Sequence, residues 1–245
     1  MAKAFVLKGW GIECEAEMKR AAQATGVFSA VEDLVLPKIL SSSAGVQVRW
    51  PFEKGDWVLL PGGFSFSDHF GSGKLLALKL RELGFFKAVE TSELSLLGVC
   101  NGFQVLTESG LFGNDTRLLG NEPGGFKNRW IRLRRGEEKM RLPVRHGEGR
   151  LSWKGSLPLE VKAFLHYDEE SFDNGSRDRI AGLVRHRGGS VICGMMPHPE
   201  IALGTLDDPD VFATDYFEHH RAELWNQEGA GLKLMKRIFS KENLV

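Results

Sequence analysis

The stretch Leu96-Leu97-Gly98-Val99-Cys100-Asn101-Gly102-Phe103-Gln104-Val105-Leu106 carries the strongest structural signal in the chain. Its apolar residues before Gly98 predict a buried strand, and those after Gly102 predict a helix. Between them lies Gly-x-Cys-x-Gly, the thiol counterpart of a nucleophile elbow, where glycines are needed because side chains would collide with neighbouring backbone. The helix N-terminus favours a thiolate, the attacking form of Cys100. A small buried cysteine between glycines is also common packing, so the motif needs independent support.

Other short apolar runs indicate further buried strands on either side of this stretch. They are Ala4–Leu7, Trp57–Leu60, Leu94–Val99 and Val191–Met196. Segments with helical periodicity lie at Cys14–Thr25 and Lys74–Leu83, and a final amphipathic helix is expected from about Leu232 to Phe239. Alternating strands and helices of this kind predict an α/β fold with a mostly parallel central sheet flanked by helices.

The middle of the chain has a different pattern. From Asn121 to Gly194 it is rich in glycine and basic residues, and its candidate strands are Trp130–Leu133, Val161–Leu165 and Ile180–Val184. Without a long helix between them, such strands predict additional antiparallel structure near the main sheet. No repeat or long linker divides the sequence, so we expect a single domain over residues 1–245, with an extra helical or loop segment at about 205–228.

Composition excludes several classes of function. The 245 residues are 42% hydrophobic, and 32 basic residues balance 32 acidic ones, which argues against nucleic acid or an anionic membrane as partner. No apolar stretch approaches the roughly 20 residues of a membrane helix, and no secretion signal is recognised. Three scattered cysteines, Cys14, Cys100 and Cys193, fit neither a disulfide framework nor a structural zinc site. We therefore expect a cytoplasmic chain without a metal, in which Cys14 and Cys193 serve packing.

A proton shuttle for Cys100 is available in Met196-Pro197-His198-Pro199-Glu200, directly after an apolar strand. The prolines restrict the backbone, and the two-residue spacing lets Glu200 reach the imidazole of His198. His198 would take the thiol proton while Glu200 holds the ring orientation. Since strand ends meet at the carboxyl edge of a parallel sheet, this convergence favours a triad over a surface turn.

A third strand is followed by Leu60-Pro61-Gly62-Gly63-Phe64-Ser65. Paired glycines leave backbone N–H groups unshielded, so the amides of Gly63 and Asn101 could bind the oxyanion of a tetrahedral intermediate. Taken alone, this segment is only a turn.

These motifs, in this order, resemble the class I (triad) glutamine amidotransferases. Within that family the chain is most similar to glutaminase subunits that serve a synthetase of purine biosynthesis, and the similarity extends from Phe5 to the final helix. The matching segments are Gly62–Asp68, Gly98–Gln104, Val144–Gly149 with its His-Gly-Glu-Gly sequence, and Gly194–Glu200. The sequence departs from the family at the first turn, Lys8–Gly11, and only loosely matches it over Asn121–Trp130. Two further departures, Ile201 where the family usually has arginine and the longer segment at about 205–228, bear on partner docking rather than on chemistry.

The resemblance implies a role for each matched residue. Cys100, His198 and Glu200 are the expected catalytic residues, Gly63 and Asn101 the oxyanion hole, and Gln104, Phe64 and His146 the contacts with glutamine. It also implies partners: a large synthetase subunit, which uses ATP and Mg to convert formylglycinamide ribonucleotide to its amidine with the released ammonia, and a small accessory subunit. No cofactor is expected in this chain.

Several weaker motifs have simpler interpretations. Gly71-Ser72-Gly73-Lys74-Leu75 fails as a phosphate loop, because position 75 is not Ser or Thr, and Lys74 is expected to begin a helix. Gly9-x-Gly11 lacks the third glycine of a dinucleotide site. His219 and His220 are adjacent and would point about 100° apart on a helix, which favours exposure over metal binding. The basic residues Arg132, Arg134, Arg135, Lys139 and Arg141 suit a phosphate or partner site as well as a solvated strand.

Two other classes of function remain as alternatives. A cysteine hydrolase of the α/β-hydrolase type also uses Gly-x-Cys-x-Gly, but its acid precedes the histidine by many residues. A non-catalytic interaction subunit would be expected to have lost triad positions, and here all three are present. An amidotransferase that serves another ammonia acceptor also fits.

Overall fold

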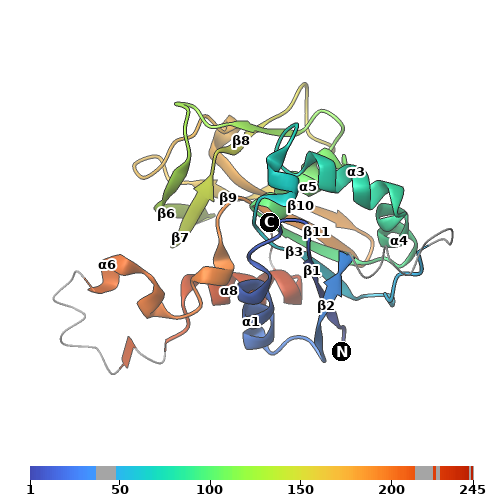
Figure 1. Cartoon of the computed structure of the whole chain (residues 1–245). Helices are drawn as coiled ribbons and strands as arrows, with labels where there is room; N and C mark the ends of the chain where they lie inside the picture. Colours follow the sequence, from blue (N-terminus) through green and yellow to red (C-terminus); the bar gives the residue numbers. More distant parts are fainter. Residues whose placement is uncertain (37–47, 213–222, 225–226, 243, 245) are drawn as a thin grey trace.

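The computed structural model describes residues 1–36, 48–212, 223–224, 227–242 and 244. One large sheet runs through the described chain in the order β2-β1-β3-β4-β11-β10-β9-β6-β7 (Figure 1). Helices cover both faces, and the hydrophobic core lies between them and the sheet. The expected α/β class with a helix-flanked sheet is confirmed.

The first five strands of this order are parallel to one another. They are β2 (Val31–Val35), β1 (Ala4–Lys8), β3 (Trp57–Leu60), β4 (Ser95–Val99) and β11 (Ser190–Met195). Every residue of β3, β4 and β11 is buried, as their continuous apolar sequences predict. Of these five, β2 is the strand without a clear sequence signal, since this edge strand carries exposed acidic residues.

The remaining four strands pair antiparallel and continue the same sheet from β11. They are β10 (Ile180–Arg187), β9 (Val161–Tyr167), β6 (Lys127–Arg135) and β7 (Glu138–His146). A separate two-stranded antiparallel sheet joins β5 (Arg117–Gly120) to β8 (Glu148–Ser152). The predicted antiparallel structure is therefore present, mostly as an extension of the main sheet.

Helices lie on both sides of the sheet (Figure 1). On one side are α1 (Glu15–Thr25) and α8 (Ala230–Ser240), and on the other are α3 (Lys74–Glu82), α4 (Phe85–Thr91) and α5 (Asn101–Glu108). Short helical turns are η1 (Ser65–Asp68), η2 (Arg177–Arg179), η3 (Pro199–Ile201), η4 (Thr205–Asp207) and α6 (Pro209–Phe212). None of the helices in the described ranges is long and apolar enough to cross a membrane.

Helix α8 supports the loop that follows β11. Its apolar side is buried, and Phe239 packs edge-on against Trp57 with ring centroids 5.1 Å apart. At its start, Gly231 approaches the carbonyl of Pro199 so closely that a Cβ atom there would overlap it. This contact requires glycine and holds η3 against the body of the protein.

Candidate active site

Cys100 lies in the sharp turn between β4 and α5. Its backbone has φ 51° and ψ −108°, a strained conformation for a residue with a side chain. A Cβ at Gly98 would lie 2.7 Å from the backbone carbon of Gly102, and one at Gly102 would overlap the carbonyl of Leu60. The expected collisions at both glycines are confirmed, and they account for the Gly-x-Cys-x-Gly spacing.

His198 and Glu200 follow the strand next to β4. Because β4 and β11 pair in parallel, with Val99 opposite Met195, the two loops leave the sheet at the same edge. His198 Nδ1 lies 2.6 Å from Glu200 Oε1, and both side chains are almost wholly buried. The two-residue spacing therefore brings the carboxylate onto the imidazole.

Gly62 places Cys100 beside this histidine. A Cβ built at Gly62 would lie 2.8 Å from His198 Cε1 and 3.5 Å from Cys100 Cβ. The backbone N–H of Cys100 also donates to Met195 on β11, at 2.8 Å. Three strand ends thus meet around one small space, which leaves room for a glycine but for no larger residue.

The charge state of His198 is set by its neighbours. Burial disfavours the imidazolium, but the Glu200 carboxylate and the Cys100 thiolate outweigh burial and raise the pKa of His198 well above its ordinary value. His198 Nε2 is buried and has no hydrogen-bond partner among the described residues. The arrangement therefore favours the imidazolium form of His198 beside Cys100.

Gly63 and Asn101 are the residues predicted to form an oxyanion hole. Gly63 has φ 142°, and a Cβ there would lie 2.6 Å from both Glu13 N and Gly11 O. Asn101 begins α5, and its Oδ1 accepts the backbone N–H of Ser65 at 3.2 Å. Among the described residues, no acceptor is found for the backbone N–H of Gly63 or Asn101. Both groups are free to donate.

Gln104 and Phe64 lie in different settings. The Gln104 amide is buried, accepts from Asn101 Nδ2 at 2.9 Å and donates to the Glu148 carbonyl at 2.6 Å. The hydrogen bond to Glu148 links α5 to β8, and the Gln104 amide keeps a second N–H with which it can contact glutamine. Phe64 is 43% exposed, with its ring centroid 6.2 Å from that of Phe126. Phe64 therefore lies at the outer rim of the candidate active site.

His146 is a second buried histidine at the end of β7. Its Nδ1 lies 3.0 Å from Asn121 Oδ1, and its Nε2 has no partner among the described residues. Burial lowers the pKa of His146 to about 3, and the positive charge of His198 contributes to the shift. His146 is therefore neutral at physiological pH.

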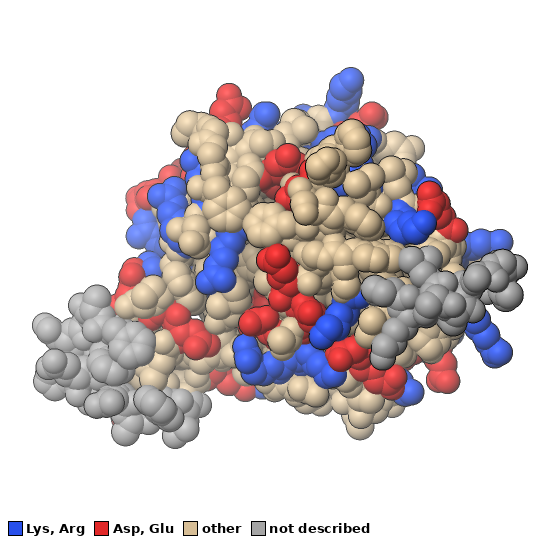
Figure 2. All heavy atoms as spheres, in the orientation of Figure 1, with Lys and Arg blue, Asp and Glu red and all other residues tan. Residues whose placement is uncertain are grey.

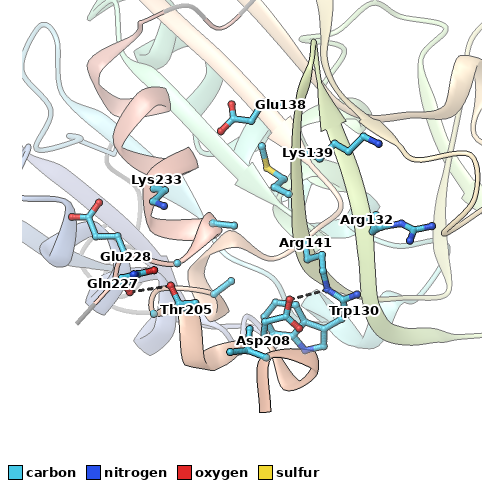
Figure 3. A pocket seen from close by; sticks show the side chains of 16 residues that line it. Trp130, Arg132, Glu138, Lys139, Arg141, Thr205, Asp208, Gln227, Glu228 and Lys233 are labelled. Atoms are coloured by element: carbon cyan, nitrogen blue, oxygen red, sulfur yellow. Dashed lines mark hydrogen bonds and ion pairs between the residues drawn. The ribbon is translucent and has the colours of Figure 1, made fainter. Parts of the chain in front are cut away.

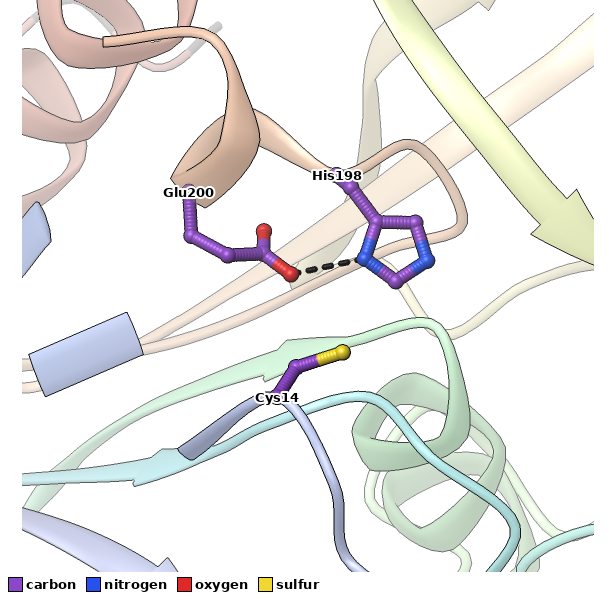
Figure 4. A group of neighbouring side chains, drawn as sticks. All are labelled: Cys14, His198 and Glu200. Carbon is purple, nitrogen blue, oxygen red and sulfur yellow. Dashed lines mark hydrogen bonds and ion pairs between the residues drawn. The ribbon is translucent and has the colours of Figure 1, made fainter. Parts of the chain in front are cut away.

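The sequence predicts only a packing role for Cys14, whereas the structure places its thiol beside the His198–Glu200 pair. Figure 4 shows its side chain below the His198–Glu200 pair, and the ligand atoms of the three residues lie within 4.8 Å of one another. Cys14 precedes α1 in the loop that follows β1, another strand ending at the same edge. In the sequence, the place of Cys14 shortly after the predicted strand Ala4–Leu7 was the signal that could have located it at this edge of the sheet. Cys193 fits the packing interpretation, since it is wholly buried on β11 and burial raises the pKa of its thiol.

The basic cluster on β6 and β7 is largely paired with carboxylates. Arg132 lies near Asp168 and Glu170, Arg134 near Glu169, Arg135 near Glu138, and Arg141 near Asp208 and Asp210. Arg141 borders a cavity of about 540 Å³ between β7 and α8, where its ion pair with Asp208 spans 2.7 Å (Figure 3). On the face in Figure 2, basic and acidic side chains are interspersed. These observations favour a solvated strand surface.

Two of the weaker motifs can also be placed. Lys74 is exposed at the start of α3, as predicted. His219 and His220 lie outside the described residues, as does much of the segment at about 205–228.

Comparison with known families decides the class. A sequence model described as a CobB/CobQ-like glutamine amidotransferase domain matches residues 1–227. The chain belongs to this glutamine amidotransferase family. Proteins called phosphoribosylformylglycinamidine synthase subunit PurQ, from two strains of Methanococcus maripaludis, are each 31% identical over 241 residues. The match covers 85% of this amidotransferase and 85% and 86% of the relatives.

Solved structures agree with this assignment. A chain from the "Structure of PurLQS from Thermotoga maritima" is 28% identical, with a TM-score of 0.64. The match covers 89% of this amidotransferase and 98% of that chain. A Thermoplasma acidophilum chain described as "a putative gmp synthase subunit a protein" has a TM-score of 0.51 at 14% identity, over 99% of this chain and 98% of its own, which indicates a shared fold.

Proposed function

We propose that Cys100, His198 and Glu200 form a catalytic triad that hydrolyses glutamine to glutamate and ammonia. One observation carries the proposal: a strained cysteine at a strand-to-helix turn shares a sheet edge with a buried histidine–carboxylate pair. The chain then acts as the glutaminase subunit of phosphoribosylformylglycinamidine synthase, the assembly for which its curated relatives are named.

The reaction begins with the thiolate of Cys100. It attacks the side-chain amide carbon of glutamine, and the resulting oxyanion accepts hydrogen bonds from the backbone N–H groups of Gly63 and Asn101. His198 protonates the amine, which leaves as ammonia, while Glu200 holds the ring. Water, deprotonated by His198, then hydrolyses the glutamyl thioester and releases glutamate.

The side chains around this centre have supporting roles. Gln104 contacts the bound glutamine and Phe64 covers the rim of the site, while neutral His146 borders its inner wall. His146 is suited to a hydrogen bond without charge, since its pKa of about 3 keeps the ring neutral beside the imidazolium of His198. The exposed ring of Phe64 is placed to screen the substrate from water.

The ammonia passes to a partner. We expect a separate synthetase subunit to use ATP and Mg for conversion of formylglycinamide ribonucleotide to its amidine, and a small accessory subunit to join them in the cytoplasm. The related Thermotoga maritima structure, which is named PurLQS, supports an assembly of this kind. A single 245-residue domain would provide the glutaminase half.

The experiment is to replace Cys100 with alanine and assay the reconstituted complex. Cys100→Ala should reduce glutamine-dependent amidine formation by at least about 1,000-fold, because no nucleophile remains. Ammonia-dependent synthesis should be unchanged, which controls for assembly. Cys193→Ala, which removes a buried thiol from the same sheet, should retain glutamine use. Persistent glutamine use by Cys100→Ala would refute the mechanism, and glutamate release without amidine formation would indicate another acceptor.

A further inference from the structure

A second cavity lies against the triad. It has a volume of about 450 Å³, and it borders the start of α1 and the loop through η3. Its lining residues are Glu13, Cys14, Glu17, Arg20, Arg145, Glu200, Ile201, Leu203 and Asp207. Four carboxylates face two guanidinium groups, so the charge of this lining favours a cation.

Three different donor groups lie together at this acidic cavity: Cys14 and Glu200 line it, and His198 is hydrogen-bonded to Glu200. Cys14 contributes a thiol, His198 an imidazole and Glu200 a carboxylate, and the ligand atoms all lie within 4.8 Å of one another. Figure 4 shows the three side chains converging, with Cys14 from the loop before α1 and the other two from the loop at η3. Groups bound to one zinc ion are separated by roughly 3.5 Å, so small side-chain rotations would complete the set.

The carboxylate is also incompletely satisfied. Glu200 is wholly buried and lines the cavity, but its Oε2 has no hydrogen-bond partner among the described residues. A buried carboxylate oxygen without a partner is unfavourable, and such groups are found where an ion or water completes the site. This observation is independent of the donor spacing, and it points to a ligand with positive charge.

We infer that this cavity binds a zinc-class divalent cation through Cys14 Sγ, His198 Nδ1 and Glu200. The donor set selects the metal, because thiolate and imidazole favour Zn²⁺ or Co²⁺, whereas Mg²⁺ and Ca²⁺ require oxygen ligands. Binding releases the thiol proton of Cys14 and the proton shared between His198 Nδ1 and Glu200. Water from the cavity would supply a fourth ligand.

The consequence is reversible inhibition of the glutaminase. With the metal on Nδ1, the neutral ring carries its remaining proton on Nε2, and it then cannot accept a proton from Cys100 or water. This consequence rests on the role proposed for His198, whereas metal binding itself does not.

Binding is tested with Co²⁺ on the full chain, kept reduced with a phosphine. One equivalent should give a near-ultraviolet thiolate-to-cobalt absorption band that Zn²⁺ removes. Cys14→Ser should abolish the band, whereas Cys100→Ser and Cys193→Ala should retain it. Ile201→Arg places a positive charge in the cavity and should weaken Co²⁺ binding by about 10-fold or more.

Inhibition is measured in the reconstituted complex, with each variant compared with its own metal-free rate. Saturating Zn²⁺ should lower glutamine-dependent activity at least about 10-fold, and Cys14→Ser should raise the half-inhibitory zinc concentration at least about 10-fold. Absence of the cobalt band, or a band that requires Cys100 and not Cys14, would overturn the site. Full activity with zinc bound would overturn the Nδ1 assignment. A cobalt band in a chain that never uses glutamine would refute the proposed function and leave the metal site standing.

Discussion

Two histidines, His198 and His146, are equally buried near the same edge of the sheet, yet their protonation is opposite. Each is 2% exposed. His198 has a carboxylate partner at 2.6 Å, and its pKa lies well above the ordinary value. His146 has a neutral amide partner, Asn121, at 3.0 Å, and its pKa falls to about 3. The charge of each ring is therefore decided by its hydrogen-bond partner and not by how deeply the side chain is buried.

The difference separates two functions of one residue type. Next to Glu200, burial strengthens an ion pair and prepares a ring that can give and take protons. Next to Asn121, burial removes the charged form and leaves a rigid neutral ring, tied through the same amide to the carbonyl of His146 at 2.8 Å. The first arrangement suits acid–base chemistry and the second suits positioning.

The largest expected effect comes from giving His198 the kind of partner that His146 has. Glu200→Gln replaces the carboxylate with an amide of the same size. Without the negative charge the pKa of His198 should fall, and glutaminase kcat should decrease by about 10²–10⁴-fold. Steady-state glutamate release by the reconstituted complex measures the change.

The matched control for that experiment is Glu90→Gln, which alters an exposed residue of α4 paired with Arg187 at 3.5 Å. Its activity should equal that of the unmodified chain. A Glu200→Gln rate within a factor of two of that control would show that the carboxylate does not govern His198.

The next effect is on stability as a function of pH, and the two histidines should act in opposite directions. His146 has a depressed folded pKa, so the unfolded chain binds more protons below pH 6.5, and stability falls from there toward pH 3. The slope is at most about 1.4 kcal/mol per pH unit. His198 has a raised folded pKa, so its contribution is present below pH 6.5 and is lost as pH rises through the folded value.

Denaturant unfolding of the unmodified chain, His146→Gln and Glu200→Gln between pH 4.5 and 9 separates these contributions. His146→Gln should flatten the loss of stability on the acid side, because its amide can still donate to Asn121 without titrating. Glu200→Gln should flatten the decline on the alkaline side. An unchanged acid limb in His146→Gln would show that this ring is not held neutral.

The smallest expected effect tests how firmly His146 is positioned. A Cβ at Gly149 would overlap the His146 ring, so Gly149→Ala should lower the free energy of unfolding by about 1–3 kcal/mol. Gly147→Ala is the matched control, because the nearest atom to its Cβ would be Phe126 Cδ2 at 3.8 Å. Equal stability of the two variants in urea unfolding would mean that the ring moves aside freely.

Much of the fold follows from local sequence. Strands such as β3 and β4, which are buried throughout, are recognisable in the sequence as continuous apolar runs. Helices α1 and α3 are recognisable from the helical spacing of their apolar residues. Edge strand β2, with its exposed acidic residues, and short helix α4 lack those signals. The joining of the antiparallel strands to β11 is also not predictable, because long-range pairing depends on contacts between distant segments.

For the candidate site, the sequence alone determined the elements that depend on near neighbours: the glycines that permit the Cys100 turn, and the spacing that brings Glu200 onto His198. Steric overlap and short chain reach act within a few residues, so they are visible as motifs. Only the tertiary structure decided that Cys14 lies beside that pair and that His146 has a neutral partner. Those contacts join segments far apart in the sequence, and strand order is what brings them together.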